Sequence, residues 1–162
     1  IRKYSALTLA SIAVPVNGDH ELARANAYLA LTHYIFGKNK LYLQIAKTAV
    51  VLHEYKMLAD GRDFLGMSFI LPSKYALEKA PEPLDQRIKL QQKPAHMVAC
   101  RIYSGSSDEE KVNKYSSELR DWLGQYSSYK AVAEVQVAEY DQPSTLPFLR
   151  KNEIHIDVKM LN

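Results

Sequence analysis

Five histidines and one cysteine are the residues of this chain best suited to nucleophilic or metal chemistry. The histidines are His20, His33, His53, His96 and His155. No two of them stand four residues apart and no Cys-x-x-Cys pair accompanies them, so their spacing does not predict a zinc site. Cys100 shares strand phase with Val98 and Ile102, which predicts a small buried apolar side chain rather than a nucleophile or half of a disulfide.

Other common catalytic patterns are missing from the sequence. It contains neither the Gly-x-Ser-x-Gly elbow of serine hydrolases nor a glycine-rich phosphate loop, so hydrolysis and nucleotide chemistry have no positive support. Asp108, Glu109 and Glu110 stand where a helix is predicted to begin, and there they complement its dipole rather than act as an acid-base pair. We therefore expect no catalytic residues and predict a protein that is not an enzyme.

Composition limits the partners of the chain. Its 162 residues, 47% hydrophobic and 24% charged, suit one soluble domain with its own core. Lys and Arg exceed Asp and Glu by only 21 to 18 and are interspersed with them, which argues against nucleic acid as a partner. No apolar run reaches the roughly 18 residues that a membrane helix needs. The sequence begins without methionine and leaves open whether a leader precedes it; we expect a cytoplasmic rather than an exported protein.

The first half of the chain predicts strands around one helix. Residues 2–14 are rich in β-branched and small side chains and predict a strand that ends at a turn over residues 15–18. Asp19 can cap a helix over residues 20–36, and Gly37 stands at the left-handed position that ends it. Apolar runs at residues 45–52 and 64–71 have the length of strands.

The second half repeats this order. Strands are predicted at residues 95–103, 131–138 and 153–160, and Ser107 with Glu110 forms a capping box before a helix. One face of that helix is apolar and should pack on a sheet: Val112, Tyr115, Leu119, Trp122, Leu123 and Tyr126. We therefore predict a single α+β domain over residues 1–162, in which duplicated β-α-β-β halves form a curved, barrel-like antiparallel sheet with two helices.

Five segments occur in the order of one known family. They are YIFGKN at 34–39, MSFILP at 67–72, PLDQRI at 83–88, PAHMVACRIYSG at 94–105 and YDQPSTLPFLRKNE at 140–153. These segments resemble the YIxGxN, MSFxxP and PLDxRV motifs, the strand that ends at a Ser-Gly turn, and the loop before the last strand of SOUL haem-binding proteins. The resemblance implies haem as a cofactor and the fold shared with gyrase-inhibitor-like effector-binding domains.

In that family the tetrapyrrole is thought to lie over the first helix. Here Tyr28, Leu31, Tyr34 and Ile35 match the positions that pack on the sheet, which leaves a second, mostly apolar stripe on the helix. The stripe consists of Leu22, Ala25, Leu29, Thr32, His33 and Phe36. It lines a haem pocket, packs as ordinary core against the loop around residues 146–148, or lies half-exposed.

The resemblance also implies basic side chains near the haem propionates. His33 stands where some relatives carry a lysine, so it could donate to a carboxylate, ligate iron, or simply lie on the surface near the helix C-terminus. Phe148 and Arg150 could clamp a planar anionic ligand. Alternatively, Arg150 pairs with Asp141 or Glu153 and fixes the loop.

Two positions depart from the family pattern. Lys3 stands in the strand where some animal members carry a histidine proposed as haem ligand, so that ligand is not carried over. The family's Ile-x-Met-Thr-x-Pro-Val strand reads IAKTAVV at residues 45–51. Strand parity places Lys47 on an apolar face with Ile45 and Ala49, where its amine either reaches a propionate or alters the pocket.

The resulting hypothesis is a non-enzymatic protein that holds haem or a related tetrapyrrole in a hydrophobic groove beside the first helix, for transport, buffering or delivery. The predicted cofactor-binding residues, with His33 as a candidate iron ligand, are Ala25, Leu29, Thr32, His33, Phe36, Lys47, Phe148 and Arg150. A small-molecule sensor or protein-interaction scaffold that does not bind haem is the first alternative, which the lysines at positions 3 and 47 favour. A hydrolase in the same pocket is the second.

Overall fold

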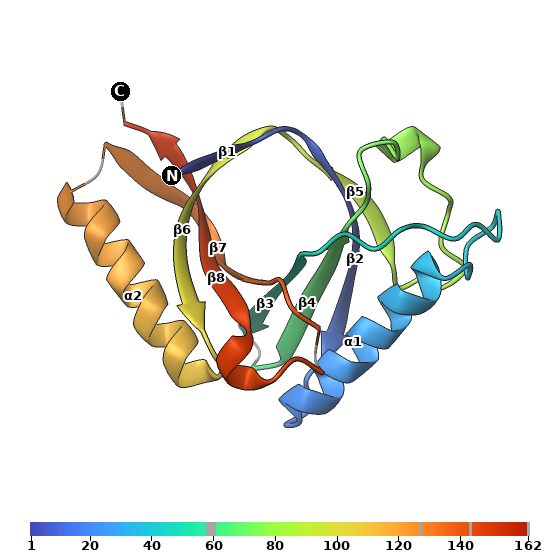
Figure 1. Ribbon diagram of the computed structural model, residues 1–162, viewed down its shortest axis with the longest axis horizontal. Helices are drawn as coiled ribbons and strands as arrows, with labels where there is room; N and C mark the ends of the chain where they lie inside the picture. The colour runs from blue at the N-terminus through green and yellow to red at the C-terminus, as the bar shows by residue number, and fades with distance from the viewer. Residues whose placement is uncertain (58–60, 127, 143, 162) are drawn as a thin grey trace. The chain divides into compact units, whose positions relative to one another are not determined.

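The structure is a computed structural model, and it describes residues 1–57, 61–126, 128–142 and 144–161. Pro143, which belongs to the segment at 140–153, lies outside these residues. The chain divides into two compact units: unit 1 is Ile1–Ser5 with Pro94–Asn162, and unit 2 is Ala6–Lys93. Each unit consists of a four-stranded antiparallel sheet and one α-helix, so the predicted α+β class is confirmed (Figure 1).

Unit 2 contains the first helix. Its elements are β2 (Leu7–Pro15), α1 (His20–Ile35), β3 (Val51–Met57), β4 (Asp63–Ile70), the 3-10 helix η1 (Leu77–Lys79) and β5 (Lys89–Lys93). β4 pairs with β3 and β2, and β5 pairs with β2, so the strand order is β3-β4-β2-β5. In the register that places Ile12 opposite Met67, alternate side chains of β2 and β4 point to one face of the sheet.

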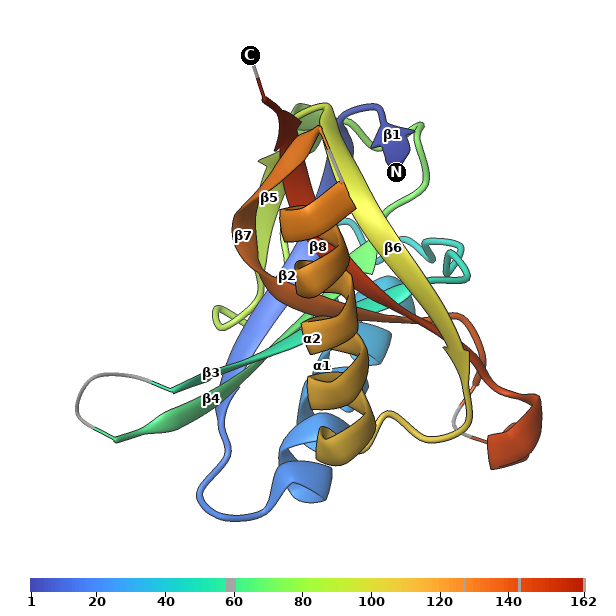
Figure 2. The same cartoon turned by 90° about the vertical axis from the view of Figure 1, so that its left-hand side faces the viewer.

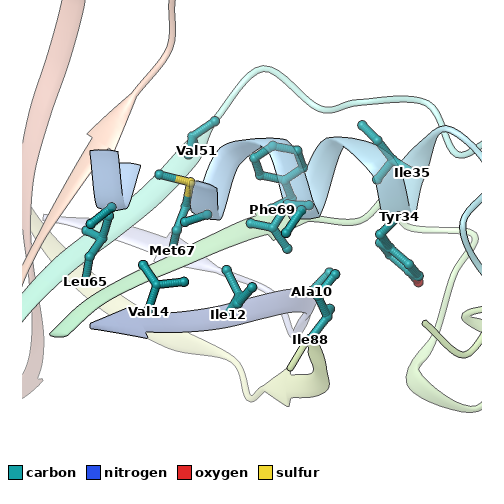
Figure 3. Close-up of a cluster of buried hydrophobic side chains, with 14 of the residues drawn as sticks. Ala10, Ile12, Val14, Tyr34, Ile35, Val51, Leu65, Met67, Phe69 and Ile88 are labelled. Carbon is teal, nitrogen blue, oxygen red and sulfur yellow. The ribbon is translucent and has the colours of Figure 1, made fainter. Parts of the chain in front are cut away.

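α1 covers this face and completes the core of unit 2 (Figure 3). Leu31, Tyr34 and Ile35 are the helix side chains that reach deepest, with at most 2% of their surface exposed. They meet buried residues of the strands and of the segment before β5, namely Ala10, Ile12, Val14, Val51, Leu65, Met67, Phe69 and Ile88. The face of α1 predicted to pack on the sheet is thus the buried one.

Both ends of α1 follow the sequence signals. The Asp19 carboxylate accepts a 2.9 Å hydrogen bond from the Leu22 amide, which caps the N-terminus. At the C-terminus Gly37 has φ +108°, a value that side chains with a Cβ disfavour. These two residues fix the length of the helix to within one residue of the prediction.

Unit 1 contains the second helix and the strand at the start of the chain. Its elements are β1 (Arg2–Tyr4), β6 (His96–Ser104), α2 (Glu109–Tyr126), β7 (Tyr129–Glu139), the 3-10 helix η2 (Pro147–Leu149) and β8 (Lys151–Met160). β8 pairs with β6 and β7, and β1 pairs with β6, which gives the order β1-β6-β8-β7. The register of β7 against β8 shifts between Ala131 and Val135.

α2 lies along the sheet of unit 1 (Figure 2) and buries Leu119 and Leu123 against it. The sheet contributes Ala99, Val137, Ile154, Ile156 and Val158. Trp122, predicted on the same face, has 44% of its surface exposed. The predicted capping box is wrong: Asp108 caps α2 by accepting the Lys111 amide at 3.0 Å, whereas the Ser107 hydroxyl accepts from Tyr103.

The predicted duplication is confirmed, because β2-α1-β3-β4 and β6-α2-β7-β8 have the same order of elements and the same strand pairing. One strand was predicted in the wrong place. Residues 45–50 form no strand; β3 begins at Val51 and continues through His53 and Glu54 as the hairpin partner of β4. Ile45, 4% exposed, instead fills the core as a single residue.

Neither helix among the described residues combines the length and the apolar character that crossing a membrane requires.

Candidate functional site

A groove in unit 2 lies beside the first helix. Its volume of 570 Å³ lies within the range of about 300–1,000 Å³ that is typical of small-molecule sites. One wall comes from α1 and the other from the segment before β5. Its lining residues are Asn26, Leu29, Ala30, His33, Tyr34, Lys38, Leu84, Asp85, Arg87 and Ile88.

The lining of the groove is more polar than apolar, and its apolar part comes from a few side chains. Tyr34 and Ile88, 1% and 4% exposed, belong to the core of unit 2 and give the groove a fixed base. Leu29 on α1 and Leu84 on the other wall each expose about half of their surface. Two leucines that face solvent in a groove offer apolar area that a flat hydrophobic ligand could cover.

Three basic side chains line the same groove. Arg87 is bound to Asp85 by hydrogen bonds of 2.6 Å from Nη2 to Oδ2 and 2.9 Å from Nε to Oδ1. The hydrogen bond from Arg87 lowers the pKa of Asp85, so the carboxylate is ionised and offsets the charge of the guanidinium. Lys38 therefore supplies the positive charge, and Lys38 and His33 supply the donors, that are available to an anionic group of a ligand.

Lys38 also orients His33. The Lys38 ammonium lies 3.4 Å from Nδ1 of His33. An ammonium can only donate, so this contact makes Nδ1 the acceptor and leaves the ring proton on Nε2. In that tautomer His33 presents an N–H donor at Nε2, which suits a carboxylate better than an iron ion.

Five of the predicted site residues belong to α1 or to its C-terminal cap. Leu29 and His33 line the groove, whereas Ala25, Thr32 and Phe36 belong to α1 or its C-terminal cap without lining it. Of these three, Phe36 is 66% exposed. The stripe on this side of α1 is therefore largely exposed and does not form part of the core.

Lys47, also in unit 2, does not line the groove and lies instead over two aromatic rings of that unit. Its ammonium lies 5.7 Å from the ring centre of Tyr28 and 5.4 Å from that of Phe69. Burial lowers the pKa of Lys47, while the two ring faces stabilise its charged form. The predicted apolar strand face is wrong, because residues 45–50 form no strand; Lys47 is exposed, and its ammonium is held by the two cation-π contacts.

Phe148 and Arg150 belong to unit 1. Phe148 is 71% exposed in η2. The Arg150 Nε donates a 2.7 Å hydrogen bond to the Thr145 carbonyl, and the Asp141 carboxylate accepts the Lys151 amide at 2.6 Å. Arg150 thus bonds within its own loop through the Thr145 carbonyl, and its predicted pairing with Asp141 or Glu153 stays a prediction.

One wall of the groove was not predicted from the sequence. Leu84, Asp85, Arg87 and Ile88 lie in PLDQRI, which served only as a mark of family resemblance. The sequence could have indicated this wall, because PLDQRI combines charged and apolar residues in a predicted loop, and binding residues often lie on loops. Lys38 was missed in the same way, within YIFGKN.

Comparison with known proteins identifies the family. The sequence matches the family described as SOUL heme-binding protein over residues 1–157. The chain belongs to the SOUL family. No curated protein matches the sequence. For this SOUL protein, haem or tetrapyrrole binding is therefore established at the level of the family.

Solved structures share the SOUL chain's fold at low sequence identity. A hydrolase from Listeria innocua has a TM-score of 0.63 and 9% identity, over 98% of this chain and 91% of that one. The C-terminal domain of EcmrR has a TM-score of 0.65 and 13% identity, over 99% and 96%. SAV2435 bound to tetraphenylphosphonium has a TM-score of 0.54 and 14% identity, over 98% and 92%. At such identities the similarity concerns the fold alone.

Proposed function

We propose that this SOUL protein binds haem or a related tetrapyrrole, without catalysing a reaction, in the groove between α1 and residues 84–88. The observation that carries the proposal is the composition of the groove within a haem-binding family. It joins exposed apolar side chains on both walls to basic groups at its rim. A macrocycle with an apolar face and two carboxylates needs that combination.

Apolar contact should provide most of the affinity. Leu29 and Leu84 each have about half of their surface still exposed, and covering it gains about 25 cal/mol per Å². Lys38 and the Nε2–H of His33 would donate to a propionate at the solvent-exposed rim, where such a contact contributes about 1 kcal/mol or less. Loss of the Leu29 side chain should therefore weaken binding more than loss of either donor, Lys38 or His33.

The proposal uses part of the predicted site. Leu29 and His33 stay in it, and Lys38, Leu84 and Arg87 join them. For Ala25, Thr32, Phe36, Lys47, Phe148 and Arg150 a role in ligand binding remains a prediction. Delivery, buffering and transport are all compatible with a groove that is open at its rim.

A haemin titration followed through the Soret band tests the proposal. We expect one haemin per chain and at least a tenfold weaker affinity in Leu29→Asp. Leu22→Asp is the matched control, because Leu22 is an equally exposed leucine of α1 that does not line the groove. Equal losses in the two variants would exclude this groove as the site.

Metal-free protoporphyrin IX separates carboxylate recognition from iron ligation. The Nδ1 lone pair of His33 accepts from Lys38 and its Nε2 carries a proton, so His33 is expected to bind a propionate rather than iron. We therefore expect protoporphyrin and haemin to bind with similar affinity. His33→Ala should weaken the binding of both by about threefold. A loss in His33→Ala confined to haemin would make His33 an iron ligand instead.

The porphyrin titrations also bear on the alternative of a sensor or scaffold that does not bind haem. If neither porphyrin binds saturably, the haem proposal fails. Tetraphenylphosphonium, named as the ligand of the structural neighbour SAV2435, is then the probe for a lipophilic-cation sensor. Saturable binding of that cation alone would favour the sensor.

A further inference from the structure

A second cluster of chemically active side chains lies in unit 1, on the face of the sheet that α2 does not cover. Cys100 and His155 are directly opposite each other in β6 and β8, and Glu153 precedes His155 by two residues. Because side chains alternate along a strand, all three point to the same face. One potential ligand atom from each of them lies within 4.8 Å of the other two.

The cluster is held in place before any ligand arrives. Glu153 accepts hydrogen bonds of 2.8 Å from both Nη atoms of Arg2, from the Tyr140 hydroxyl and from Nε2 of His155. Glu153 and His155 expose only 1% and 6% of their surface. Burial alone would raise the pKa of Glu153, but the hydrogen bonds from Arg2, His155 and Tyr140 outweigh it and lower the pKa to about 2.

We propose that Cys100, Glu153 and His155 bind a zinc ion. The three residues offer one sulfur, one nitrogen and one oxygen ligand. Zn²⁺ accepts this mixture, whereas Mg²⁺ and Ca²⁺ prefer oxygen ligands alone. The fourth tetrahedral position would be left for water or a small ligand. This site is separate from the groove and does not depend on haem binding.

The present distances are close to those that zinc requires. Zinc bonds of about 2.0 to 2.3 Å in a tetrahedron place neighbouring ligand atoms roughly 3.2–3.7 Å apart. Nε2 of His155 lies 2.8 Å from Oε2 of Glu153, so these atoms must separate slightly. The Cys100 sulfur lies within 4.8 Å of the other two ligand atoms, so it must come closer by at most about 1.3 Å.

Zinc binding changes the protonation of two ligands. Burial raises the pKa of Cys100, so the metal-free residue is a thiol that hydrogen bonds to the Val98 carbonyl at 3.8 Å. Zn²⁺ must displace the proton of that thiol, which is released to water as the zinc-sulfur bond forms. Nε2 of His155, which donates its proton to Glu153 in the metal-free cluster, must also give up that proton: a neutral ring transfers it through water to Nδ1, and an imidazolium releases it to water.

Arg2 should weaken zinc binding through its positive charge and its hydrogen bonds to Glu153, which gives the proposal a further test. With Cys100 and Glu153 as anions, Zn²⁺ and the Arg2 guanidinium leave the cluster with one net positive charge. Arg2 also uses lone pairs of Glu153 that the metal needs. Arg2→Met should therefore bind zinc more tightly than the wild type, by at least threefold.

The wild-type protein, prepared without a histidine tag, allows the first test. The sequence contains one cysteine, so the reaction of 5,5′-dithiobis(2-nitrobenzoate) reports on Cys100 alone. We expect one equivalent of Zn²⁺ to slow this reaction at least tenfold and a chelator to restore it. An unchanged rate at 100 µM Zn²⁺, about the weakest affinity of interest, would overturn the proposal.

Co²⁺ gives a second readout of the ligands. We expect one equivalent of Co²⁺ to produce an absorption band from cobalt-thiolate charge transfer, which disappears in Cys100→Ser and weakens in His155→Asn. The control is His96→Asn, because His96 lies on β6 but bonds to the Pro94 carbonyl and is outside the cluster. Loss of the band in the control, or its survival in Cys100→Ser, would also overturn the proposal. If Cys100→Ser does not fold, the thiol reaction of the wild type decides.

Discussion

The Tyr34 hydroxyl donates a 2.9 Å hydrogen bond to the Pro81 carbonyl in the interior of unit 2. This bond joins the last turn of α1 to the segment that provides the opposite wall of the groove. Burial raises the pKa of Tyr34 to about 12, with a smaller contribution from Tyr75, so the hydroxyl keeps its proton and can donate. This buried contact therefore helps to position both walls, together with the backbone hydrogen bonds from the Lys40 amide to Glu82 and from the Leu84 amide to Lys38.

Tyr34→Phe tests that contact. The variant keeps the ring but leaves the buried Pro81 carbonyl without this donor, so we expect the free energy of unfolding to fall by about 1–2 kcal/mol. Urea unfolding measures the loss. Tyr28→Phe, on the same helix, is the control, since Tyr28 is only partly buried and its ring packs edge-on against Phe69. Similar losses in both variants would mean that the Pro81 bond contributes nothing specific.

Asn39 should be one of the most sensitive positions outside the hydrophobic core. It is fully buried; its Nδ2 donates to the carbonyls of Tyr34 and Leu43, and its Oδ1 accepts the amides of Leu41 and Leu43. We expect Asn39→Ala to cost about 2–4 kcal/mol in urea unfolding, because several buried backbone groups lose their partner.

Asn113→Ala is the control for this variant, since Asn113 is an exposed residue of α2. We expect a change within about 0.5 kcal/mol there. If Asn39→Ala changed stability as little as Asn113→Ala, the Asn39 side chain would not hold its loop.

The fold followed from the sequence where a local signal and the hydrophobic pattern agreed. Asp19 and Gly37 predicted both ends of α1 because a cap depends on residues next to it in the chain. The strand at residues 45–52 was wrong because an apolar run alone does not distinguish a strand from a single buried residue such as Ile45. β5 was missed because it is an edge strand of unit 2 with the polar sequence KLQQK.

The candidate site was predictable only in part. Leu29 and His33 were found because they stand on the face of α1 opposite its core stripe, which a helical period reveals. Arg87 and Leu84 stand about fifty residues later, and periodicity carries no information on a contact of that separation. The cluster of Cys100, Glu153 and His155 needed the register of β6 against β8, which no single strand's sequence specifies.

The cap of α2 should make stability depend on pH. The hydrogen bond from the Lys111 amide, followed by that from the Ser106 hydroxyl, lowers the pKa of Asp108 to about 2 from its ordinary 3.8. A depressed folded-state pKa stabilises the fold above the ordinary value, and this contribution is lost as the pH falls from about 4 to 2. Asp108 is exposed, so solvent screens its charge and keeps the effect small.

We expect Asp108→Ala to lose about 1 kcal/mol at pH 7 and to approach the wild type near pH 2. Asp108→Asn keeps an oxygen acceptor without a titrating charge, so its smaller loss should vary less with pH. Chemical unfolding of the three proteins between pH 2 and 7 measures both effects. A deficit of Asp108→Ala that stayed constant over this range would show that ionisation of Asp108 does not matter to the cap.

The pair of Arg2 and Glu153 should be strongly coupled, because one partner is buried. Glu153 is 1% exposed, and Arg2→Met would leave its carboxylate in the interior without the guanidinium. We expect each of Arg2→Met and Glu153→Gln to cost about 2–4 kcal/mol, and the double variant to cost less than their sum by about 1–3 kcal/mol. Urea unfolding of the four proteins in the presence of a chelator measures this coupling without interference from metal.

Asp85 and Arg87 provide the control, a double-mutant cycle on an exposed arginine-carboxylate pair. They form the same kind of multiple hydrogen bonds, but their side chains are 31% and 63% exposed, so we expect a coupling below about 1 kcal/mol. The comparison isolates burial, since both cycles remove an arginine-carboxylate pair. If the two couplings were equal, burial of Glu153 would not strengthen its pairing, and Arg2 would present a smaller barrier to a metal at the Cys100 cluster than the geometry indicates.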